Sequence, residues 1–517
     1  MIDRRDFLKT VSQSAVAVAA SSCAGRTPRL VPAGPAAGGR HALADLALHE
    51  ATRLGASYAD VRFTSAALHR LYLLDLKTAA DEELETVGRA SGFGVRVLVE
   101  QAWGFASSDR DDADGVQAAV RRAVDIAAAE AKRPDHRPVT LVAAPRAEIT
   151  RRLAGHRDPA SVPHEPKIAA LLRINERLLK VPGIIHANVS VRFDHEWRLL
   201  ATTDGTRIDE ETGRVFSQVT AHAQKGRRLR KRTYVSAPRA GGFEAFDPEA
   251  LLAQCDRLAD EAVAKCTAAF FDDHEVDLIA TSSHMVLPLH ICVALPTEID
   301  RSVGPRGDGE SFLRPADIGS RRYGPPLLNV NGGANAGRAY DDEGVKRDRF
   351  PMIRDGVLVG VQTTRDTAGA ASASASTGCA YAVSWAHAPL LRSSALSIEP
   401  DARAGSLADL IADTKVGVLV DGLGAWHSSA SGSFESKADA AWEIRNGRIV
   451  SMLDDIRYAA KATDLFGAIN AVTGTAETSV TAHDAKGAPA QLLEHEHRAP
   501  AVRFNGIRVA SGSRHGF

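Results

Sequence analysis

The sequence contains few cysteines and no excess of charge of either sign. Five cysteines occur in 517 residues, and none of them forms a Cys-x-x-Cys pair. This sparse set does not resemble a disulfide framework, and it predicts buried free thiols at Cys255, Cys266, Cys292 and Cys379. The formal net charge is −1, with 25% charged and 44% hydrophobic residues, an ordinary globular composition. A balanced charge implies no basic face, so we expect no nucleic-acid partner.

The chain also lacks an apolar run long enough to remain in a bilayer as a helix, although its first residues resemble an export signal. Arg4 and Arg5 are followed by Phe-Leu-Lys and then by a short alanine-rich stretch. Paired arginines in this setting are typical of a twin-arginine (Tat) signal, which exports folded proteins. We therefore expect residues 1–39 to be an export signal and linker, and the protein to be periplasmic. The stretch "ASSC" leaves open a lipoprotein cleavage site at Cys23.

Hydrophobic periodicity predicts both helices and strands in the first half of the chain. The stretch "ADGVQAAVRRAVDIAAAEA" (113–131) has apolar residues at helical spacing, whereas "YADVRFTSAALHRLYLLDL" (58–76) alternates as a strand does. "SGFGVRVLVEQAWGFASS" (91–108) indicates two strands joined by a tight turn. The other elements that we expect here are helices at 40–56, 166–180 and 248–269, and strands at 185–203 and 213–223.

The second half has a different character, because short strands and Gly- and Ser-containing turns dominate after about residue 270. Helices are expected only near 285–295, 406–412 and 462–470. The sequence thus predicts an α+β protein, with an N-terminal α/β domain at 40–245 and a β-rich, barrel-like antiparallel domain at 246–517. The sequence has no P-loop and no Gly-x-Ser-x-Gly nucleophile elbow.

Several segments, taken in their order along the chain, resemble the TldD/PmbA family, a group of microbial proteins linked to metallopeptidase activity. The resemblance covers roughly residues 40–510. The matching stretches are "GASYADVRF" (55–63), "GFGVRVLVEQAWGFAS" (92–107), "HICVALPTEIDR" (290–301), "GESFL" (309–313), "YDDEGV" (340–345), "IRDGVLVGVQTTRDTA" (353–368), "SGSFESKADAAWEIRNGRIV" (431–450) and "RAPAVRFNGIRV" (498–509).

The resemblance implies a zinc helix, and this chain departs from it at the positions that carry the chemistry. Active relatives have a His-Glu-x-x-x-His pattern, in which two imidazoles hold the metal and the glutamate acts as general base; a cysteine further along completes the ligands. Here His290 occupies the first ligand position, Ile291 the position of the base and Leu295 that of the second histidine. The stretch "HDAKGAP" (483–489) aligns with the cysteine segment and places Asp484, or His483, at the third ligand.

Two interpretations of this departure remain open. In the first, the zinc chemistry is lost, no cofactor is bound, and the protein binds peptides or pairs with an intact relative. In the second, an active peptidase has rebuilt a zinc site from His290, Asp484 or His483, and His495 or His497 of "EHEH" (494–497). His495 and His497 would share one side of a strand, and the alternative is an exposed polar strand face.

The remaining charged motifs have structural interpretations. Asp341-Asp342-Glu343-Gly344 predicts a turn, since Asp and Gly favour that geometry. Glu298 and Asp300 predict a local turn or helix start, or groups that surround the former metal site. The basic run at 224–232 predicts a solvated hairpin or loop. By resemblance we also expect a homodimer, or a heterodimer with another TldD/PmbA-like chain, around a cleft that receives a peptide or small protein substrate.

Overall fold

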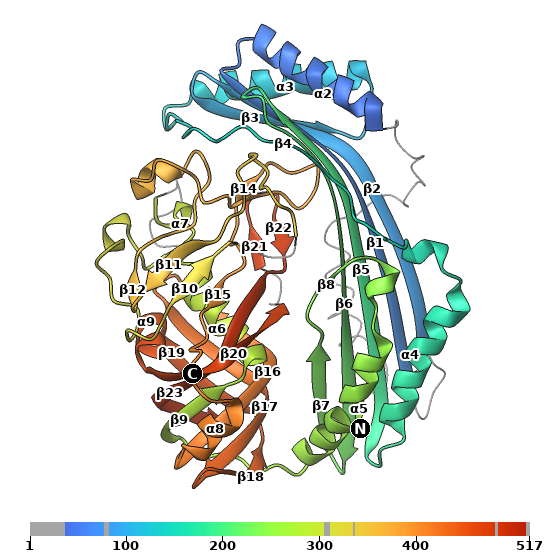
Figure 1. Ribbon diagram of the computed structural model, residues 1–517, viewed down its shortest axis with the longest axis vertical. Coiled ribbons are helices and arrows are strands. Elements are labelled where there is room, and N and C mark those ends of the chain that lie inside the picture. The colour runs from blue at the N-terminus through green and yellow to red at the C-terminus, as the bar shows by residue number, and fades with distance from the viewer. Residues whose placement is uncertain (1–36, 77–81, 304–310, 334–336, 481–483, 513–517) are drawn as a thin grey trace.

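The computed structural model describes residues 37–76, 82–303, 311–333, 337–480 and 484–512, and it places a long curved sheet beside a β-barrel (Figure 1). The twin-arginine segment, Cys23 and His483 lie outside these residues. Among the helices of the described ranges, none combines the length and the apolar character that a membrane crossing requires.

Four long antiparallel strands form the centre of the first sheet, and their order is β2-β1-β5-β6. They are β1 (Tyr58–Leu76), β2 (Glu82–Val99), β5 (Ile184–Thr202) and β6 (Arg207–Lys225). A 19-residue strand is roughly 60 Å long, so these strands span the molecule. The shorter strands β3 (Ala102–Ser108), β4 (Glu148–Arg151), β7 (Arg228–Val235) and β8 (Arg239–Ala240) extend the edges.

The two faces of this sheet have different partners because successive side chains of a strand point to opposite faces. Val61 and Phe63 belong to the apolar core under α2 (Ala37–Arg53) and α3 (Ala113–Ala131). Leu71 and Leu73 belong to the core under α4 (His164–Leu179) and α5 (Pro248–Lys265). Arg62, which lies between Val61 and Phe63, points to the opposite face of the sheet. There it donates to the carbonyl oxygens of Ser384 and His387 in the C-terminal part (3.0 and 2.9 Å).

Five strands close the barrel of the C-terminal part. They are β9 (His274–Ala280), β16 (Val416–Ser428), β17 (Ser433–Arg445), β19 (Ile456–Lys461) and β23 (Glu496–Ser511). The ring closes because β23 pairs with both β19 and β9. The predicted α+β class with a β-rich, barrel-like second half is therefore confirmed.

Smaller elements decorate the barrel. Strands β18 (Arg448–Leu453) and β20 (Ile469–Val480) pair with β17 and β23. β15 (Ser397–Ile398), β10 (Val330–Gly332), β11 (Phe350–Arg354) and β12 (Val357–Leu358) continue the sheet from β23. The C-terminal part also contains two small hairpins, β13 (Ala380–Tyr381) with β14 (Leu390–Leu391) and β21 (Asp484–Lys486) with β22 (Gln491–Leu493). Its α-helices are short: α6 (Ser282–Leu289), α7 (Asp300–Val303), α8 (Leu407–Ala412) and α9 (Ala462–Gly467).

The local predictions are largely confirmed, with one correction. The expected strand 58–76 and helix 113–131 have these bounds in the structure, and the four predicted free cysteines are buried. The basic run forms the β6–β7 hairpin as predicted. The prediction that this hairpin is solvated is wrong for Arg232, which is 1% exposed and forms ion pairs with acids of α5 and the barrel. Helix α5, which follows the expected boundary at 245–246, packs on the first sheet through Leu251, Cys255 and Leu258.

Two glycines of β2 create the space in which the C-terminal part docks on the first sheet. A methyl group added at Gly92 would lie 2.6 Å from the ring of Trp385, and one at Gly94 would lie 2.6 Å from the Trp385 carbonyl oxygen. Trp385 belongs to the loop between β13 and β14, so the "GFG" stretch forms a contact surface of the interface.

Replacing Gly94 with alanine is expected to destabilise the protein by about 1–3 kcal/mol, because the methyl group overpacks a site that also contains the ring of Phe105. Thermal and denaturant unfolding measure the change. Gly88→Ala on the same strand is the matched control, since nothing lies within 4 Å of its added methyl group. Equal effects of the two substitutions would contradict the docking role of Gly94.

Candidate functional site

The segment that resembles a zinc helix is a helix followed by a π-helical turn. Helix α6 ends at Leu289, and the turn His290–Ala294 is closed by the Leu295 N–H, which donates to the His290 carbonyl oxygen (2.9 Å). Such turns widen a helix by one residue and are frequent at functional sites. Ile291 lies in the barrel core and Leu295 packs against it, so both departures from the family pattern have apolar surroundings.

The structure brings three of the predicted site residues together. His290 from the π-helical turn, Asp484 from β21 and His495 just before β23 place their ligand atoms within 4.8 Å of one another. Their exposed fractions are 1%, 8% and 4%. This buried group is called the histidine–aspartate cluster below. The fourth candidate, His483, lies outside the described residues.

His497 is a neighbour of the cluster, and the "EHEH" strand has two distinct sides. The rings of His495 and His497 are parallel within 6° and face His290. Glu494 and Glu496 instead pair with arginines of the first sheet. The predicted alternation is confirmed, but the expectation of an exposed strand face is wrong, since both histidines are buried under the loop at 393–396.

A chain of hydrogen bonds assigns the proton positions of two of these rings. The Leu396 N–H donates to His497 Nδ1 (2.9 Å). A neutral imidazole carries one proton, so His497 carries it on Nε2 and donates to His290 Nδ1 (2.9 Å). The proton of His290 is then on Nε2, a buried atom without a hydrogen-bond partner in the described part of the chain. Burial, with the charge of His495 added, lowers the pKa of His290 to about 3, which is consistent with a neutral ring.

The other half of the cluster is an ion-paired aspartate. His495 donates from Nδ1 to the Ser393 carbonyl oxygen (3.0 Å), and its Nε2 lies 2.7 Å from Asp484 Oδ1. The Arg392 guanidinium lies 2.8 Å from the same oxygen and is 1% exposed. Burial alone would raise the pKa of Asp484, but its hydrogen bond with His495 and the nearby positive charges outweigh burial and lower it. The sequence reasoning missed Arg392, for which no motif gave a signal.

The acidic flank of the segment is also ordered around the cluster. Lys486 Nζ binds Glu298 (2.7 Å), Asp300 (2.8 Å) and the carbonyl oxygen of Leu391 (2.8 Å). Asp300 begins α7, as predicted. Burial alone would raise the pKa of Glu298, but Lys486 and Arg301 together hold it below its usual range. Glu298 is therefore a charged partner of these cations and is engaged on both oxygens.

A large cavity lies between the first sheet and the barrel and reaches the edge of the cluster. Its volume is about 1070 Å³, and His497 is among its lining residues. Consecutive residues of β7 (Thr233, Tyr234 and Val235) line one wall, and Glu477 to Val480 of β20 line another. Neighbouring residues that line the same space indicate that a strand presents its edge to it.

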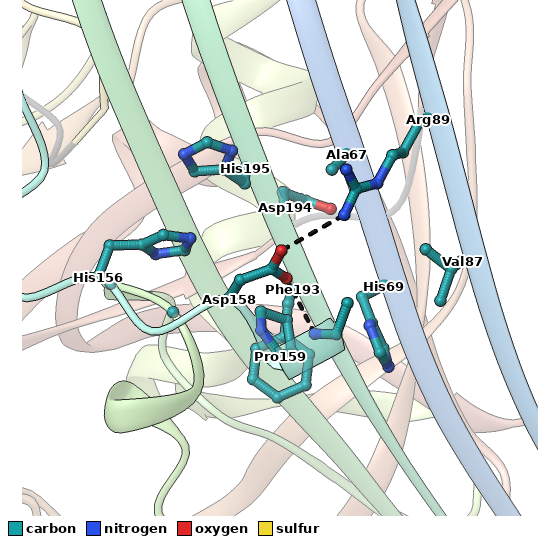
Figure 2. A pocket seen from close by; sticks show the side chains of 13 residues that line it. Ala67, His69, Val87, Arg89, His156, Asp158, Pro159, Phe193, Asp194 and His195 are labelled. Carbon is teal, nitrogen blue, oxygen red and sulfur yellow. Dashed lines mark hydrogen bonds and ion pairs between the residues drawn. The ribbon is translucent and has the colours of Figure 1, made fainter. Parts of the chain in front are cut away.

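A second, much smaller pocket lies on the first sheet and does not contain a comparable cluster (Figure 2). It has room for about one water molecule, with a volume of about 10 Å³. His156 and His195 stack there at 4.4 Å, beside Asp158, which pairs with Arg89 (3.4 Å). Within the described residues, only the histidine–aspartate cluster groups three potential metal ligands.

Comparison with known proteins identifies the family. Models of the three PmbA/TldA metallopeptidase domains match the chain: domain 1 at residues 78–127, the central domain at 157–269 and the C-terminal domain at 309–511. A metalloprotease of Methanocaldococcus jannaschii is 24% identical over 435 residues, which are 82% of this chain and 91% of that protein. A metalloprotease of Synechocystis is 25% identical over 408 residues, 76% of this chain and 82% of its own length.

The solved structures agree on the fold. TldE from Thermococcus kodakarensis superposes with a TM-score of 0.69 over 90% of this chain and 100% of its own, at 16% sequence identity. The fold and the matched domains define a protein of the metallopeptidase-like class. The chain belongs to the PmbA/TldD family.

The family implies zinc, and the cluster as built does not fit a tightly held zinc ion. A metal ligand must offer a lone pair, but the hydrogen-bond chain leaves the proton of His290 on Nε2. Two ligands of one tetrahedral zinc ion stand about 3.3 Å apart, given bonds of about 2.0–2.1 Å, whereas His495 and Asp484 approach to the hydrogen-bond distance of 2.7 Å. Ile291 supplies no base, and the base position is enclosed in the core.

Replacing Asp484 with alanine is expected to destabilise the protein by about 3–5 kcal/mol, because the buried Arg392 loses its carboxylate. Denaturant unfolding measures the loss. Asp256→Ala is the matched control, since the Asp256–Arg177 pair is more than half exposed on both sides and water screens its attraction, so its removal should change stability little. A loss at Asp484 as small as that of the control would show that the pair contributes little.

Proposed function

We propose that this PmbA/TldD-family protein is a peptide-binding chain that has exchanged the zinc site for a metal-free histidine–aspartate cluster. The observation that carries the proposal is the hydrogen-bond chain from Leu396 through His497 to His290, which places a proton where a metal would need a lone pair. The cluster then orders the loop at 392–396 and the start of β23, which together form the cavity wall beside it.

The cavity supports binding of an extended peptide. Strand β7 pairs only with β6, and β20 only with β23, among the described strands, so each has an edge that can accept another strand. These two edges are the walls of the cavity. Backbone hydrogen bonds to a strand edge provide affinity that depends little on the peptide sequence.

Metal analysis of the purified mature protein, combined with a peptide-cleavage assay, tests the loss of zinc chemistry. We expect zinc far below one ion per chain and no cleavage above background after incubation with zinc. His290→Ala should change neither result. Stoichiometric zinc that is lost in His290→Ala, but retained in the control His427→Ala on the exposed end of β16, would refute the proposal.

A zinc-dependent peptidase that uses His290, Asp484 and His495 is the second candidate. It is favoured by the convergence of three buried donors and by two buried atoms, His290 Nε2 and Asp484 Oδ2, that lack hydrogen-bond partners in the described part of the chain. The same preparation decides between the candidates. Cobalt substitution adds a direct readout, because a histidine-ligated cobalt ion absorbs visible light and an unoccupied cluster does not.

Peptide binding is tested with one extended peptide in two forms. The unmodified peptide is expected to bind, and the same peptide with N-methyl groups on alternate residues is expected to bind at least about tenfold more weakly, because it cannot complete the strand ladder. Calorimetry measures both affinities. Equal affinities would exclude recognition through a strand edge and leave the side chains of the cavity as the determinants.

Export and assembly belong to the same proposal. The paired Arg4 and Arg5 support Tat-dependent export to the periplasm, and replacement of both by lysine should retain the protein in the cytoplasm. A heterodimer with an intact PmbA/TldD chain would place the cavity next to a catalytic partner, whereas a homodimer would pair two peptide-binding chains. Adding an intact relative to the cleavage assay and comparing its rate with and without this chain tests that role.

A further inference from the structure

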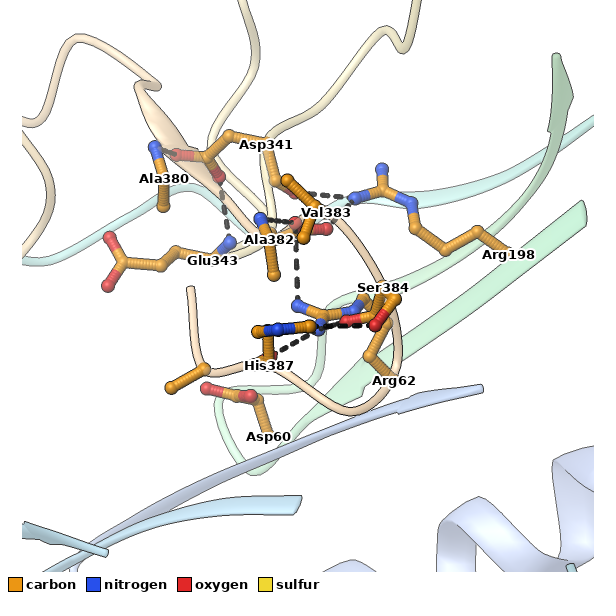
Figure 3. Close-up of polar contacts among 12 residues, drawn as sticks. Asp60, Arg62, Arg198, Asp341, Glu343, Ala380, Ala382, Val383, Ser384 and His387 are labelled. Carbon is orange, nitrogen blue, oxygen red and sulfur yellow. Dashed lines mark hydrogen bonds and ion pairs between the residues drawn. The ribbon is translucent and has the colours of Figure 1, made fainter. Parts of the chain in front are cut away.

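A buried polar interface joins the first sheet to the turn at 341–344 (Figure 3). The turn predicted from the sequence is present: Asp341 Oδ1 accepts from the N–H groups of Glu343 and Val345, and Gly344 has a φ of +77°. Its three acidic residues are each 2% exposed or less. They lie among arginines that project from the first sheet.

Each acid of the turn has different partners. Asp342 contacts Arg62 (3.4 Å), Arg198 and Arg338 (3.1 Å). Glu343 and Asp60 share the guanidinium of Arg96, which lies 3.1 Å from Glu343 and 2.8 Å from Asp60. The second oxygen of Glu343 accepts from the Arg365 backbone N–H (2.7 Å).

Among the described residues Asp341 has no cationic partner, and its side-chain oxygens accept from backbone N–H groups at residues 343, 345 and 380. The interface consequently contains more carboxyl groups than cations. Six acids (Asp60, Glu196, Glu210, Asp341, Asp342 and Glu343) face four arginines (Arg62, Arg96, Arg198 and Arg338). Arg365, which is buried as well, and the more exposed Arg151 add two cations, and Asp204 and Asp366 add two acids. The excess of acid therefore remains when these four residues are counted.

The location of this interface means that it helps to hold the first sheet against the barrel beside the cavity. The chain passes from the first sheet to the barrel once among the described elements, between α5 and β9, where Arg232 binds Asp421 and Asp439. The interface at 341–343 lies where Arg198 pairs with Glu210, near one end of the long strands, whereas Arg232 lies opposite Ala221, nearer the other end. The lining residues from Arg232 to Glu496 place the cavity between the two contacts. Loss of the contact at 341–343 would leave the lower end joined and Glu494 and Glu496 paired with Arg192 and Arg214, so this contact controls the opening of the upper end of the interface, beside the cavity.

We propose that the turn at 341–343 is a protonation-controlled latch, in which Glu343 holds a proton while the first sheet and the barrel are closed on each other. The groups that face Glu343 are Arg96, Asp60 and Tyr58 of the first sheet, and Asp341, Asp366 and Arg365 of the C-terminal part. Arg96 is shared with Asp60, and two further acids lie close by. The negative charge of an ionised Glu343 is therefore poorly compensated in this interface, from which water is excluded.

The electrostatics of the turn support the latch and give its pH range. Burial raises the pKa of Glu343 from 4.5 to about 8, and burial raises the pKa of Asp341 to about 6. In an opened interface Glu343 would regain its ordinary value, so the closed state is favoured most below pH 4.5. The free-energy preference for the closed state decreases as the pH rises toward 8, and it no longer changes above pH 8. Between pH 6 and 8 one proton is released on opening, which makes opening up to about tenfold easier per pH unit.

Hydrogen exchange of the intact protein tests this inference without any peptide, so its outcome is independent of the proposed peptide binding. Protection factors, which are corrected for the intrinsic pH dependence of exchange, are measured between pH 6 and 9.5 for residues 338–346, where the Ala339 N–H donates to Glu210 across the interface (3.1 Å). We expect them to fall by up to about tenfold per unit to pH 8 and to level off above it. Glu343→Gln, which keeps the size of the side chain, should show no slope.

Two controls make the result specific. Glu196→Gln removes a salt bridge to Arg338 in the same interface, so it should lower protection at every pH and keep the wild-type slope. Residues 417–421 in the barrel core report global unfolding and should show no comparable slope. The latch is overturned if Glu343→Gln retains the slope, if wild-type protection does not depend on pH, or if the barrel core shows the same dependence.

Discussion

Ion pairs that are shielded from water join the first sheet to the barrel, and the other functional features depend on them. Arg62, Arg96 and Arg198 project from one face of the long strands because the strand period alternates them with the apolar residues that pack under the helices. A guanidinium in such a place requires a carboxylate partner, since an isolated buried charge is very costly. The acidic turn at 341–343 supplies these partners, and its position fixes how far the barrel lies from the sheet.

The cavity and the histidine–aspartate cluster are consequences of that placement. The cavity is the space left between the interface at 341–343 and the second set of ion pairs around Arg232. The "EHEH" strand crosses from one environment to the other, with its glutamates on arginines of the first sheet and its histidines toward His290. Residues that hold the two parts together and histidines at the histidine–aspartate cluster therefore alternate along one short strand.

Under the proposed function, the cluster occupies the place of the family site without its zinc chemistry. His290 keeps the family position, while Ile291 and Leu295 have joined the apolar core. Asp484 at the cysteine position is held by Arg392 and His495, which gives the carboxylate a charge partner and a hydrogen bond inside the protein. Hydrogen bonding and charge pairing account for the arrangement, but three buried atoms, His290 Nε2, Asp484 Oδ2 and Arg392 Nε, lack hydrogen-bond partners in the described part of the chain.

The sequence by itself determined the elements whose causes are local. The period-2 pattern at 58–76, the helical pattern at 113–131 and the turn residues at 341–344 all appear where the residues predict them, because side-chain alternation and backbone preference act over a few residues. The motif order gave the family, and the substitutions at Ile291 and Leu295 showed which part of its chemistry to question. Only the tertiary structure decided that His495 and His497 are buried beside His290, that Arg392 pairs with Asp484, and that the acids of the turn meet arginines from strands more than a hundred residues away. These contacts depend on how the barrel docks on the sheet, and no local pattern encodes that arrangement.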